Sequence, residues 1–270
     1  MVKRASSAKI PSAGRREAVD EDFSLSGRTA LVTGAARRIG RSIALALAAE
    51  GVGVVVHYRS SRREAVELCT ELHRRGAGCW TVRADLAGPN ASAALLARAR
   101  RMAGRIDFLV NNASIFHPGT IGELTWGALE DAMRVNAWAP FALSREFART
   151  AGQGAIVNLL DSRLGSYDLA HAAYILSKHV LAVMTRMTAL EFAPHVRVNA
   201  VAPGLILPPP GKTERYLAQM VNSAPLKRHG APADVAAAVV HLLRSGFVTG
   251  EVLNVDGGRH LHGGHLWTEA

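Results

Sequence analysis

The 270-residue chain is predicted to fold as one α/β domain, a doubly wound parallel sheet of seven strands with helices on both faces. Three observations indicate this fold class. Short runs rich in Val, Ile and Leu alternate with longer stretches whose apolar residues recur at helical spacing. The short runs are apolar throughout, as strands buried on both faces require. No internal repeat is visible, and single sheets of this class commonly hold about 200 to 250 residues.

The elements are predicted in alternating order. Strands are expected at residues 29–32, 52–57, 79–82, 106–110, 155–160, 197–201 and 252–255. Helices are expected between them, at residues 39–49, 63–75, 91–103, 127–150, 172–192 and 232–244. The segment 205–230 is the least regular, because Pro208, Pro209 and Pro210 cannot continue a helix or a central strand. We interpret this segment as a lid over a substrate, or else as a rigid surface loop.

The first predicted strand leads into a glycine turn. The chain reads RTALVTGAARRIGRSIALALAAEG from Arg28 to Gly51, so the strand enters the turn at Gly34 and a helix leaves it near Ile39. Free backbone N–H groups and the helix dipole converge at such a helix start and favour an anion there. The pattern is typical of a site for a dinucleotide pyrophosphate, and an ordinary strand-to-helix connection is the alternative.

Tyr174 and Lys178 in AAYILSKH stand four residues apart, and Asp161 precedes Tyr174 by 13 residues at the end of AIVNLLD. Residues four apart share one face of a helix, so a phenol and an ammonium can reach the same site. An ammonium beside a phenol lowers the pKa of the phenol, which makes the hydroxyl a proton donor or acceptor near neutral pH. Taken alone, the spacing also fits a solvated helix face.

Six motifs in order resemble those of the short-chain dehydrogenase/reductase family across residues 28–259. They are T-G-A-A-R-R-I-G at the glycine turn, Asp85 in RADLAG, the run Asn111-Asn112-Ala113-Ser114, Asn136 in RVNAWAPF, Tyr174 with Lys178, and Pro203-Gly204. The resemblance implies a Rossmann-type fold and an oxidoreductase that uses a nicotinamide cofactor. It also implies that Asp85 contacts the adenine and that Asn136 belongs to a proton relay.

Three residues depart from the common family pattern. Arg38 stands in the place of the middle glycine of the turn, Ser114 in that of the last glycine of N-N-A-G, and Asp161 in that of the catalytic Ser. With Phe116 and the run FVTGEVLNVDGGRHLHG, these residues resemble the pteridine reductase branch and its relative, dihydromonapterin reductase. That resemblance implies an NADPH-dependent pterin reductase in which Phe116 stacks on the pterin and Arg38 reaches both pyrophosphate and substrate. A buried core position is the alternative for Phe116.

The end of the second predicted strand indicates the choice of cofactor. NAD-preferring sites place Asp or Glu there, whereas this chain has His57, Tyr58, Arg59 and Ser60. A carboxylate repels a 2′-phosphate and a guanidinium binds one, so we predict NADPH as the cofactor. The family resemblance adds Arg37 to this phosphate pocket.

Asp161 indicates the substrate. An ionised carboxylate would repel the negative charge that develops on an alkoxide, and it would raise the pKa of the nearby Tyr174. A pterin offers basic ring nitrogens and an amino-pyrimidine edge rich in donors, which suit a carboxylate better than a ketone does. A helix N-cap or a salt-bridge partner is the alternative role for Asp161.

The prediction can be stated residue by residue. For the cofactor we expect contacts from Gly34, Arg37, Arg38, Ile39, Gly40, His57, Tyr58, Arg59, Ser60, Asp85, Leu86, Asn112, Ala113, Ser114, Tyr174, Lys178, Pro203, Gly204 and Leu205. The expected substrate contacts are Arg38, Ser114, Phe116, Asp161 and Tyr174, and the expected catalytic residues are Asp161, Tyr174, Lys178 and Asn136. We predict hydride transfer from NADPH to a ring C=N with Tyr174 as proton donor. A quinone or other carbonyl substrate, and an NADP-binding protein without turnover, are the alternatives.

Composition argues against other classes. The formal net charge of +10 attracts nucleic acid but equally attracts polyanionic NADPH, and aromatic residues make up only 6% of the chain, without a stripe beside the basic residues. We therefore expect no nucleic-acid partner. No apolar run approaches the roughly 20 residues that cross a bilayer, and no secretory leader is visible. We expect a soluble, cytoplasmic protein.

Residues 1–22 are polar and aperiodic, and we expect a flexible arm ahead of a domain at residues 23–270. Cys69 and Cys79 lack the spacing of a metal site or a redox pair, so we expect structural roles for both in a reducing compartment, and no bound metal. His171 is interpreted as a packing or surface residue. The family resemblance implies a homotetramer formed through helices 127–150 and 172–192.

Overall fold

The structure is a computed structural model, which describes residues 24–88, 90–165, 168–209 and 211–262. The arm expected at residues 1–22 lies outside these ranges. In the described part, seven strands pair in parallel in one sheet with the order β3-β2-β1-β4-β5-β6-β7. Their bounds are β1 Thr29–Val32, β2 Gly53–Tyr58, β3 Cys79–Arg83, β4 Phe108–Asn111, β5 Gly154–Leu159, β6 Val196–Pro203 and β7 Val252–Val255.

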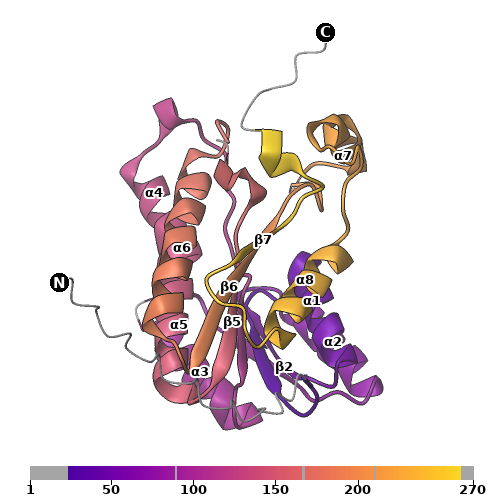
Figure 1. Cartoon of the computed structure of the whole chain (residues 1–270), viewed down its shortest axis with the longest axis vertical. Helices are drawn as coiled ribbons and strands as arrows, with labels where there is room; N and C mark the ends of the chain where they lie inside the picture. Colours follow the sequence, from indigo (N-terminus) through magenta and orange to yellow (C-terminus); the bar gives the residue numbers. More distant parts are fainter. Residues whose placement is uncertain (1–23, 89, 166–167, 210, 263–270) are drawn as a thin grey trace, which may run out of the picture.

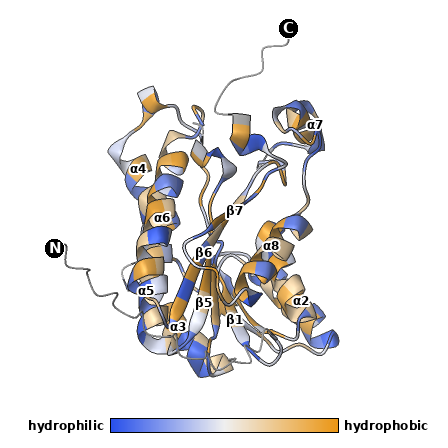
Figure 2. Cartoon of the chain, viewed as in Figure 1, coloured by the Kyte–Doolittle hydropathy of each residue, from blue (hydrophilic) through white to orange (hydrophobic). Residues whose placement is uncertain are grey.

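Helices cover both faces of the sheet (Figure 1). The α-helices are α1 Arg38–Ala49, α2 Arg62–Arg74, α3 Ala91–Ala103, α4 Trp126–Met133, α5 Ala139–Ala151, α6 Ala172–Glu191, α7 Glu214–Met220 and α8 Pro232–Arg244. One face packs against α1, α2 and α8, and the other against α3, α5 and α6. Figure 2 shows hydrophobic strands in the middle of the molecule and hydrophilic residues distributed over the helices. This layering confirms the predicted fold class.

The order and type of the predicted strands are confirmed, and one predicted helix is present but interrupted by a stretch of different helical geometry. Residues 127–150 form three elements instead of one: α4, a π-helical stretch at Arg134–Trp138, and α5. Pro140 lies in the first turn of α5, directly after the π-helical stretch, and as a proline it donates no backbone hydrogen bond there. Apolar spacing is nearly continuous through such a junction, so the pattern does not reveal it.

The segment 205–230, predicted to be irregular, contains the short helix α7 after its prolines. Leu217 anchors this helix, since its side chain is only 1% exposed. Most of the segment outside α7 and the turn that follows it has no regular structure, as the prolines require. The segment therefore consists of an irregular stretch and one short helix that is packed against the protein.

The two cysteines, for which structural roles were expected, are joined to each other, a pairing that the expectation of a reducing compartment did not include. Cys69 in α2 and Cys79 at the start of β3 form a disulfide with their Cα atoms 5.3 Å apart. The turn between α2 and β3 brings them together, and a separation of ten residues in sequence gives no sign of this contact. Within the described ranges, no helix is both long and apolar enough to cross a membrane.

The strand order reverses between β1 and β4, which are neighbours although β2 and β3 lie between them in the chain. In open parallel sheets, ligands bind in the crevice outside the carboxyl ends of the strands at such a point. Gly34 follows β1 and Asn112 follows β4, so the glycine turn and the Asn motif meet at this crevice.

Buried amide side chains tie the central strands to the helices. Asn111 Nδ2 donates to Asn158 Oδ1 at 2.8 Å and to Ser144 Oγ at 3.1 Å, and Asn158 Nδ2 donates to Thr185 Oγ1 at 2.9 Å. None of these four residues is more than 2% exposed. They link β4 and β5 to α5 and α6, and α6 also carries the predicted catalytic tyrosine and lysine.

Replacing Asn158 by Ala should lower the free energy of unfolding by about 2 to 3 kcal/mol, because it leaves the buried Asn111 amide and Thr185 hydroxyl short of a partner. Urea denaturation followed by circular dichroism measures this change. The exposed Asn254→Ala is the matched control and should stay within about 0.5 kcal/mol of the parent. Equal stability of the two variants would contradict the structural role of the buried amides.

Candidate active site

A cavity of about 420 Å³ opens where β1 and β4 end. Many of the predicted site residues line it: Gly34, Arg37, Arg38, Ile39, Gly40, His57, Arg59, Asp85, Leu86, Asn112, Ala113, Ser114, Phe116 and Tyr174. Others lie outside its wall: Tyr58, Ser60, Asn136, Asp161, Lys178, Pro203, Gly204 and Leu205. The structure thus brings the glycine turn, the end of β2, the Asn motif and α6 to one hollow.

The glycine turn is shaped for close backbone approach. At Gly40 a Cβ atom would lie only 2.3 Å from the carbonyl oxygen of Gly34, so no larger residue fits. The Asn112 amide fixes the turn by donating to the carbonyl oxygens of Thr33 and Gly34, at 2.9 and 3.1 Å. No side chain in the described residues caps the first N–H groups of α1. A helix start of this kind accepts an anion.

His57 holds the glycine turn through a hydrogen bond to its backbone. The backbone N–H of Gly34 donates to His57 Nδ1 at 3.1 Å, and His57 Nε2 lies 3.2 Å from the carbonyl oxygen of Ala84. The second contact requires the proton on Nε2, because Nδ1 acts as the acceptor. Burial lowers the pKa of His57 to about 4, so the ring is neutral. A neutral ring gives the 2′-phosphate no positive charge, and this function falls to the arginines.

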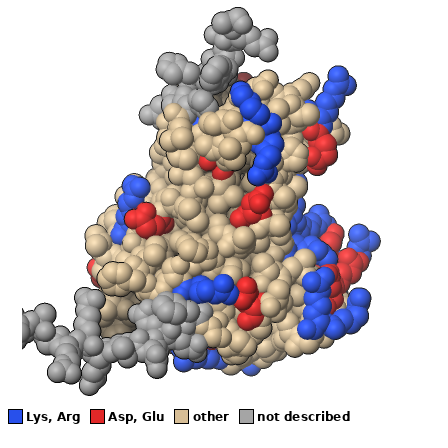
Figure 3. All heavy atoms as spheres, turned by 45° about the vertical axis from the view of Figure 1, so that its right-hand side comes forward, with Lys and Arg blue, Asp and Glu red and all other residues tan. Residues whose placement is uncertain are grey.

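The two arginines expected near a 2′-phosphate differ in their surroundings. Arg37 pairs with Glu64 and its neighbour Arg41 pairs with Glu71, so basic and acidic side chains mix on the face formed by α1 and α2 (Figure 3). Arg59 is exposed at the end of β2 and its side chain forms no ion pair with another described residue. Of the two, Arg59 presents the uncompensated charge.

Arg38 departs from ordinary backbone geometry. Its φ of 54° lies in the left-handed region, which a glycine adopts without strain and an arginine adopts at a cost on the order of 1 kcal/mol. Its Nη2 donates to the carbonyl oxygen of Pro208 at 2.8 Å. The side chain thus links the glycine turn to the segment 205–230 beside the cavity that Arg38 lines.

Asn136 lies in the π-helical stretch and is fully buried. Its Oδ1 accepts from the N–H of Ile115 at 2.8 Å and from Ser114 Oγ at 3.0 Å. Its Nδ2 donates to the carbonyl oxygen of Ile115 and to Ser177 Oγ, both at 3.0 Å. Asn136 therefore joins the loop after β4 to α6. A π-helical turn inside a helix is frequently a functional position.

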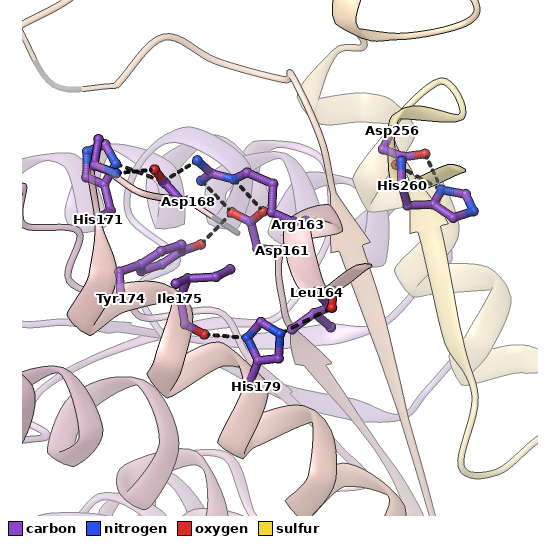
Figure 4. Close-up of polar contacts among 11 residues, drawn as sticks. Asp161, Arg163, Leu164, Asp168, His171, Tyr174, Ile175, His179, Asp256 and His260 are labelled. Atoms are coloured by element: carbon purple, nitrogen blue, oxygen red, sulfur yellow. Dashed lines mark hydrogen bonds and ion pairs between the residues drawn. The ribbon is translucent and has the colours of Figure 1, made fainter. Parts of the chain in front are cut away.

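Tyr174 and Asp161 are in direct contact (Figure 4). The Tyr174 hydroxyl donates to Asp161 Oδ2 at 3.0 Å. Arg163 grips the same carboxylate, since its Nε donates to Oδ1 and its Nη2 to Oδ2, both at 3.0 Å, and its backbone N–H donates to Oδ1 at 2.9 Å. The structure thus shows the alternative predicted for Asp161, a salt-bridge partner, together with its predicted proximity to Tyr174.

The charges of this group follow from burial and pairing. Burial of the Asp161 carboxylate, which is 14% exposed, works to raise its pKa, but the hydrogen bonds and charge of Arg163 outweigh burial and the pKa is lowered. Burial raises the pKa of Tyr174 well above its usual value, and the Asp161 charge raises it further. Asp161 is therefore ionised at neutral pH and the phenol keeps its proton.

The expectation that Lys178 lowers the pKa of Tyr174 is wrong for this structure. Lys178 Nζ donates to the carbonyl oxygen of Leu159 at 2.7 Å and lies 5.6 Å from the centre of the Tyr174 ring. Burial lowers the pKa of Lys178 to about 8. The ammonium faces a strand carbonyl, while the phenol hydroxyl faces a carboxylate, so Asp161 and burial determine the pKa of Tyr174.

Sequence reasoning missed Arg163, Asp168 and His171, which extend this group (Figure 4). Arg163 Nη1 also pairs with Asp168, and His171 Nδ1 lies 2.8 Å from Asp168 Oδ2. His171 immediately precedes α6. The signal in the sequence was the presence of two carboxylates, an arginine and a histidine within the 13 residues before Tyr174. Their pairing depends on the path of the loop and could not be deduced from spacing.

Phe116 lies between His171 and Tyr174. Its ring stacks on the imidazole of His171 with centroids 3.9 Å apart and planes at 20°, and it meets the Tyr174 ring edge-on at 4.6 Å and 87°. Phe116 is only partly buried and lines the cavity. The alternative of a fully buried core position is therefore excluded.

Replacing Arg163 by Met should make stability depend on pH. In the parent, the lowered pKa of Asp161 contributes stability that is present above the unfolded-state pKa near 4 and is lost only in stronger acid. Without the guanidinium, burial raises the pKa of Asp161. Stability is then lost as pH rises, by about 3 kcal/mol near pH 8.

Urea denaturation of parent and variant between about pH 5 and pH 8 measures this change. The control is Arg149→Met, which removes an exposed ion pair with Glu146 and should show no pH-dependent difference from the parent. A difference between Arg163→Met and the parent that stays constant across this range would contradict the assigned charge state of Asp161.

The family model described as enoyl-(acyl carrier protein) reductase matches residues 34–260. The L-xylulose reductase of Mus musculus is 36% identical over 88% of this chain and 98% of its own length. Versicolorin reductase stcU of Emericella nidulans is 32% identical over 88% of this chain and 97% of its own length. Among solved structures, FolM alternative dihydrofolate reductase 1 from Brucella canis, complexed with NADP, is 30% identical with a TM-score of 0.86, covering 93% of this chain and 100% of that one.

Proposed function

The chain belongs to the short-chain dehydrogenase/reductase family, and we propose that it is an NADPH-dependent reductase whose substrate is a pterin. One observation carries the choice of substrate. The Tyr174 hydroxyl donates to the Asp161 carboxylate, which Arg163 keeps ionised, beside the partly exposed ring of Phe116. The site thus offers a neutral proton donor, a negative charge and an aromatic wall.

These three features suit a nitrogen heterocycle better than a ketone. Reduction of a ketone develops negative charge on oxygen, and the Asp161 carboxylate next to the proton donor opposes that charge. A basic ring nitrogen of a pterin can take up a proton as the hydride arrives, so less negative charge builds up beside the carboxylate. A pterin also carries N–H groups that donate to a carboxylate. Its flat ring also stacks on Phe116, an arrangement worth about 0.5 to 1.5 kcal/mol beyond burial. The similar structure from Brucella canis is an alternative dihydrofolate reductase, and dihydrofolate contains a pterin ring, which supports this choice.

NADPH fits the residues of the crevice. The close approach enforced at Gly40 and the uncapped start of α1 suit a pyrophosphate. Arg59, with Arg37 as a second cation, suits the 2′-phosphate, and no carboxylate of β2 opposes it. We assign Asp85 and Leu86 to the adenine, and Lys178 to the nicotinamide ribose. The similar structures bound to NADP support the cofactor.

The reaction assigned to the site is reduction of a ring C=N. Bound NADPH supplies the hydride to the carbon. Tyr174 donates the proton to the adjacent nitrogen, because its raised pKa keeps the hydroxyl protonated at neutral pH. Asp161 accepts from the phenol and orients the N–H edge of the substrate. Asn136 holds the loop after β4 against α6, so that the wall of the cavity and the proton donor keep their spacing.

A second candidate is reduction of a carbonyl compound. The curated relatives named for versicolorin and L-xylulose favour it, because these proteins resemble this chain over nearly their whole length. An NADP-binding protein without turnover has less support, since Tyr174, Lys178 and Asn136 are all present and buried together. Substrate selectivity distinguishes the pterin reductase, the carbonyl reductase and the protein without turnover.

NADPH consumption should be faster with dihydrobiopterin, dihydromonapterin or dihydrofolate than with a simple quinone or a diketone. Replacing Tyr174 by Phe should lower kcat for the preferred substrate about 10²- to 10⁴-fold, because it removes the proton donor. The affinity for NADPH, measured by fluorescence titration, should not change in this variant. Preference for the quinone or diketone would select the second candidate, and no turnover with any compound would select the third.

We also propose that the chain forms a homotetramer through α4, α5 and α6. An exposed apolar row runs along α6, formed by Leu176, Val183, Met187 and Leu190, which are 40% to 83% exposed and recur at helical spacing. Trp138, at the start of α5, is 53% exposed. Apolar faces of this kind on adjacent helices commonly mark protein interfaces.

The double substitution Val183→Glu and Met187→Glu should lower the molar mass in solution toward the 28.7 kDa of one chain, because charge on this row opposes burial. Light scattering after size-exclusion chromatography measures the mass. Val66→Glu, on the exposed side of α2, is the control and should leave the mass as in the parent. A parent that elutes as a single chain would contradict the proposal.

A further inference from the structure

The proposed chemistry gives no role to His171 or Asp168, although both belong to the group around Tyr174. His171 immediately precedes α6, three residues before Tyr174. Asp168 has a side chain that is only 7% exposed, and it accepts from three directions: Arg163, the backbone N–H of Ala170 at 3.0 Å, and His171. Burying a carboxylate is costly unless it is paired and hydrogen-bonded, so this many contacts indicates a specific position.

The contacts form a closed ring. From Tyr174 it runs through Asp161, Arg163, Asp168 and His171, and it returns to Tyr174 through Phe116. Figure 4 shows the polar part of this ring, with the side chains of Arg163 and His171 meeting at Asp168. The proton donor Tyr174 and the wall residue Phe116 are therefore connected twice, once directly and once through the polar side chains.

The backbone reinforces the same connection. Gly119 donates to the carbonyl oxygen of Ala170 at 2.8 Å, and Ala172 donates to the carbonyl oxygen of Gly119 at 2.9 Å. These bonds join the loop that carries Phe116 to the start of α6. These main-chain bonds thus place His171 beside Phe116, where their rings stack. The bond to Asp168 then fixes the rotation of the imidazole ring.

We propose that His171 and Asp168 are positioning residues that hold the Phe116 ring as a fixed wall and thereby select flat, unsaturated ring substrates. The imidazole covers one side of the Phe116 ring at 3.9 Å, so the ring cannot turn away from the cavity without losing this stack. A planar substrate on the cavity side of Phe116 then completes a stack of three rings. The proposal shares with the proposed function only the use of this cavity for substrate.

The two residues act differently, and this makes them separable. His171 contacts Phe116 but not Arg163, so its loss affects substrate binding. Asp168 contacts both His171 and Arg163, and Arg163 holds Asp161 at the proton donor. Loss of the Asp168 charge therefore affects both KM and kcat. Neither residue contacts the glycine turn in the structure, so affinity for NADPH should not change.

Steady-state kinetics of four variants test the proposal, with dihydrobiopterin and menadione as flat substrates and diacetyl as a small aliphatic one. His171→Ala and His171→Asn should raise KM about 3- to 10-fold for the flat substrates and leave kcat within about twofold. His171→Phe, which keeps a ring but loses the bond to Asp168, should restore part of the loss. Asp168→Asn should raise KM and lower kcat. KM for diacetyl should stay constant in all three His171 variants.

His117→Ala is the matched control, because this exposed histidine follows Phe116 directly and should behave as the parent. NADPH titration shows that each variant is folded, and if His171→Ala fails to fold, the comparison of His171→Phe with His171→Asn decides. Equal KM in these two variants, or an equal rise of KM for diacetyl, would overturn the proposal. If dihydrobiopterin is not reduced at all, the proposed function fails, while the menadione series still tests the wall.

Discussion

The pairing of Arg163 with Asp161 is the interaction on which the rest of the site depends. A carboxylate buried beside a phenol would take up a proton if it stood alone, and it would then donate to the phenol oxygen instead of accepting from it. Arg163 reverses this order by supplying three of the hydrogen bonds that the carboxylate accepts, two from its guanidinium and one from its backbone N–H. As a result the phenol is the partner that carries the proton, and a reduction needs a proton donor in this form.

The scaffold places this pair by constraints that begin far from it. Parallel strands end at one edge of the sheet, and β5 delivers Asp161 to that edge while β4 delivers the Asn motif. Hydrogen bonds from buried amides then hold α6 to these strands, which fixes the position of Tyr174 relative to the crevice. Asn136 and the Gly119 bonds attach the loop carrying Phe116 to the same helix. Tyr174 and Lys178 are thus mounted on a regular helix, whereas Asp161 and Phe116 lie in the loops that follow β5 and β4.

The sequence predicted the sheet, the glycine turn and the residues that end at the crevice, because these features depend on short-range patterns of apolar residues and glycines. It did not predict how charges pair. Asp161 was expected beside Tyr174, but Arg163, which determines its ionisation, belongs to a short 3₁₀ turn whose path no periodicity describes. The lowering of the Tyr174 pKa expected from Lys178 was wrong, whereas the raising expected from Asp161 is confirmed. Lys178 lies four residues away on the helix, yet its ammonium is directed to the carbonyl of Leu159 by packing that spacing does not reveal.

The π-helical stretch at Arg134–Trp138 limits how this region can change in evolution. Each residue of a helix turns the chain by about 100°, so an insertion or deletion between α4 and the middle of α5 would swing the Asn136 amide away from Ile115 and Ser177. The π-helical turn holds one more residue than an α-helical turn, and the hydrogen bonds of Asn136 require this turn at its present position in the sequence. Relatives that differ in length are thus expected to do so in the segment around α7, and to keep the spacing from Trp126 to Ala151 unchanged.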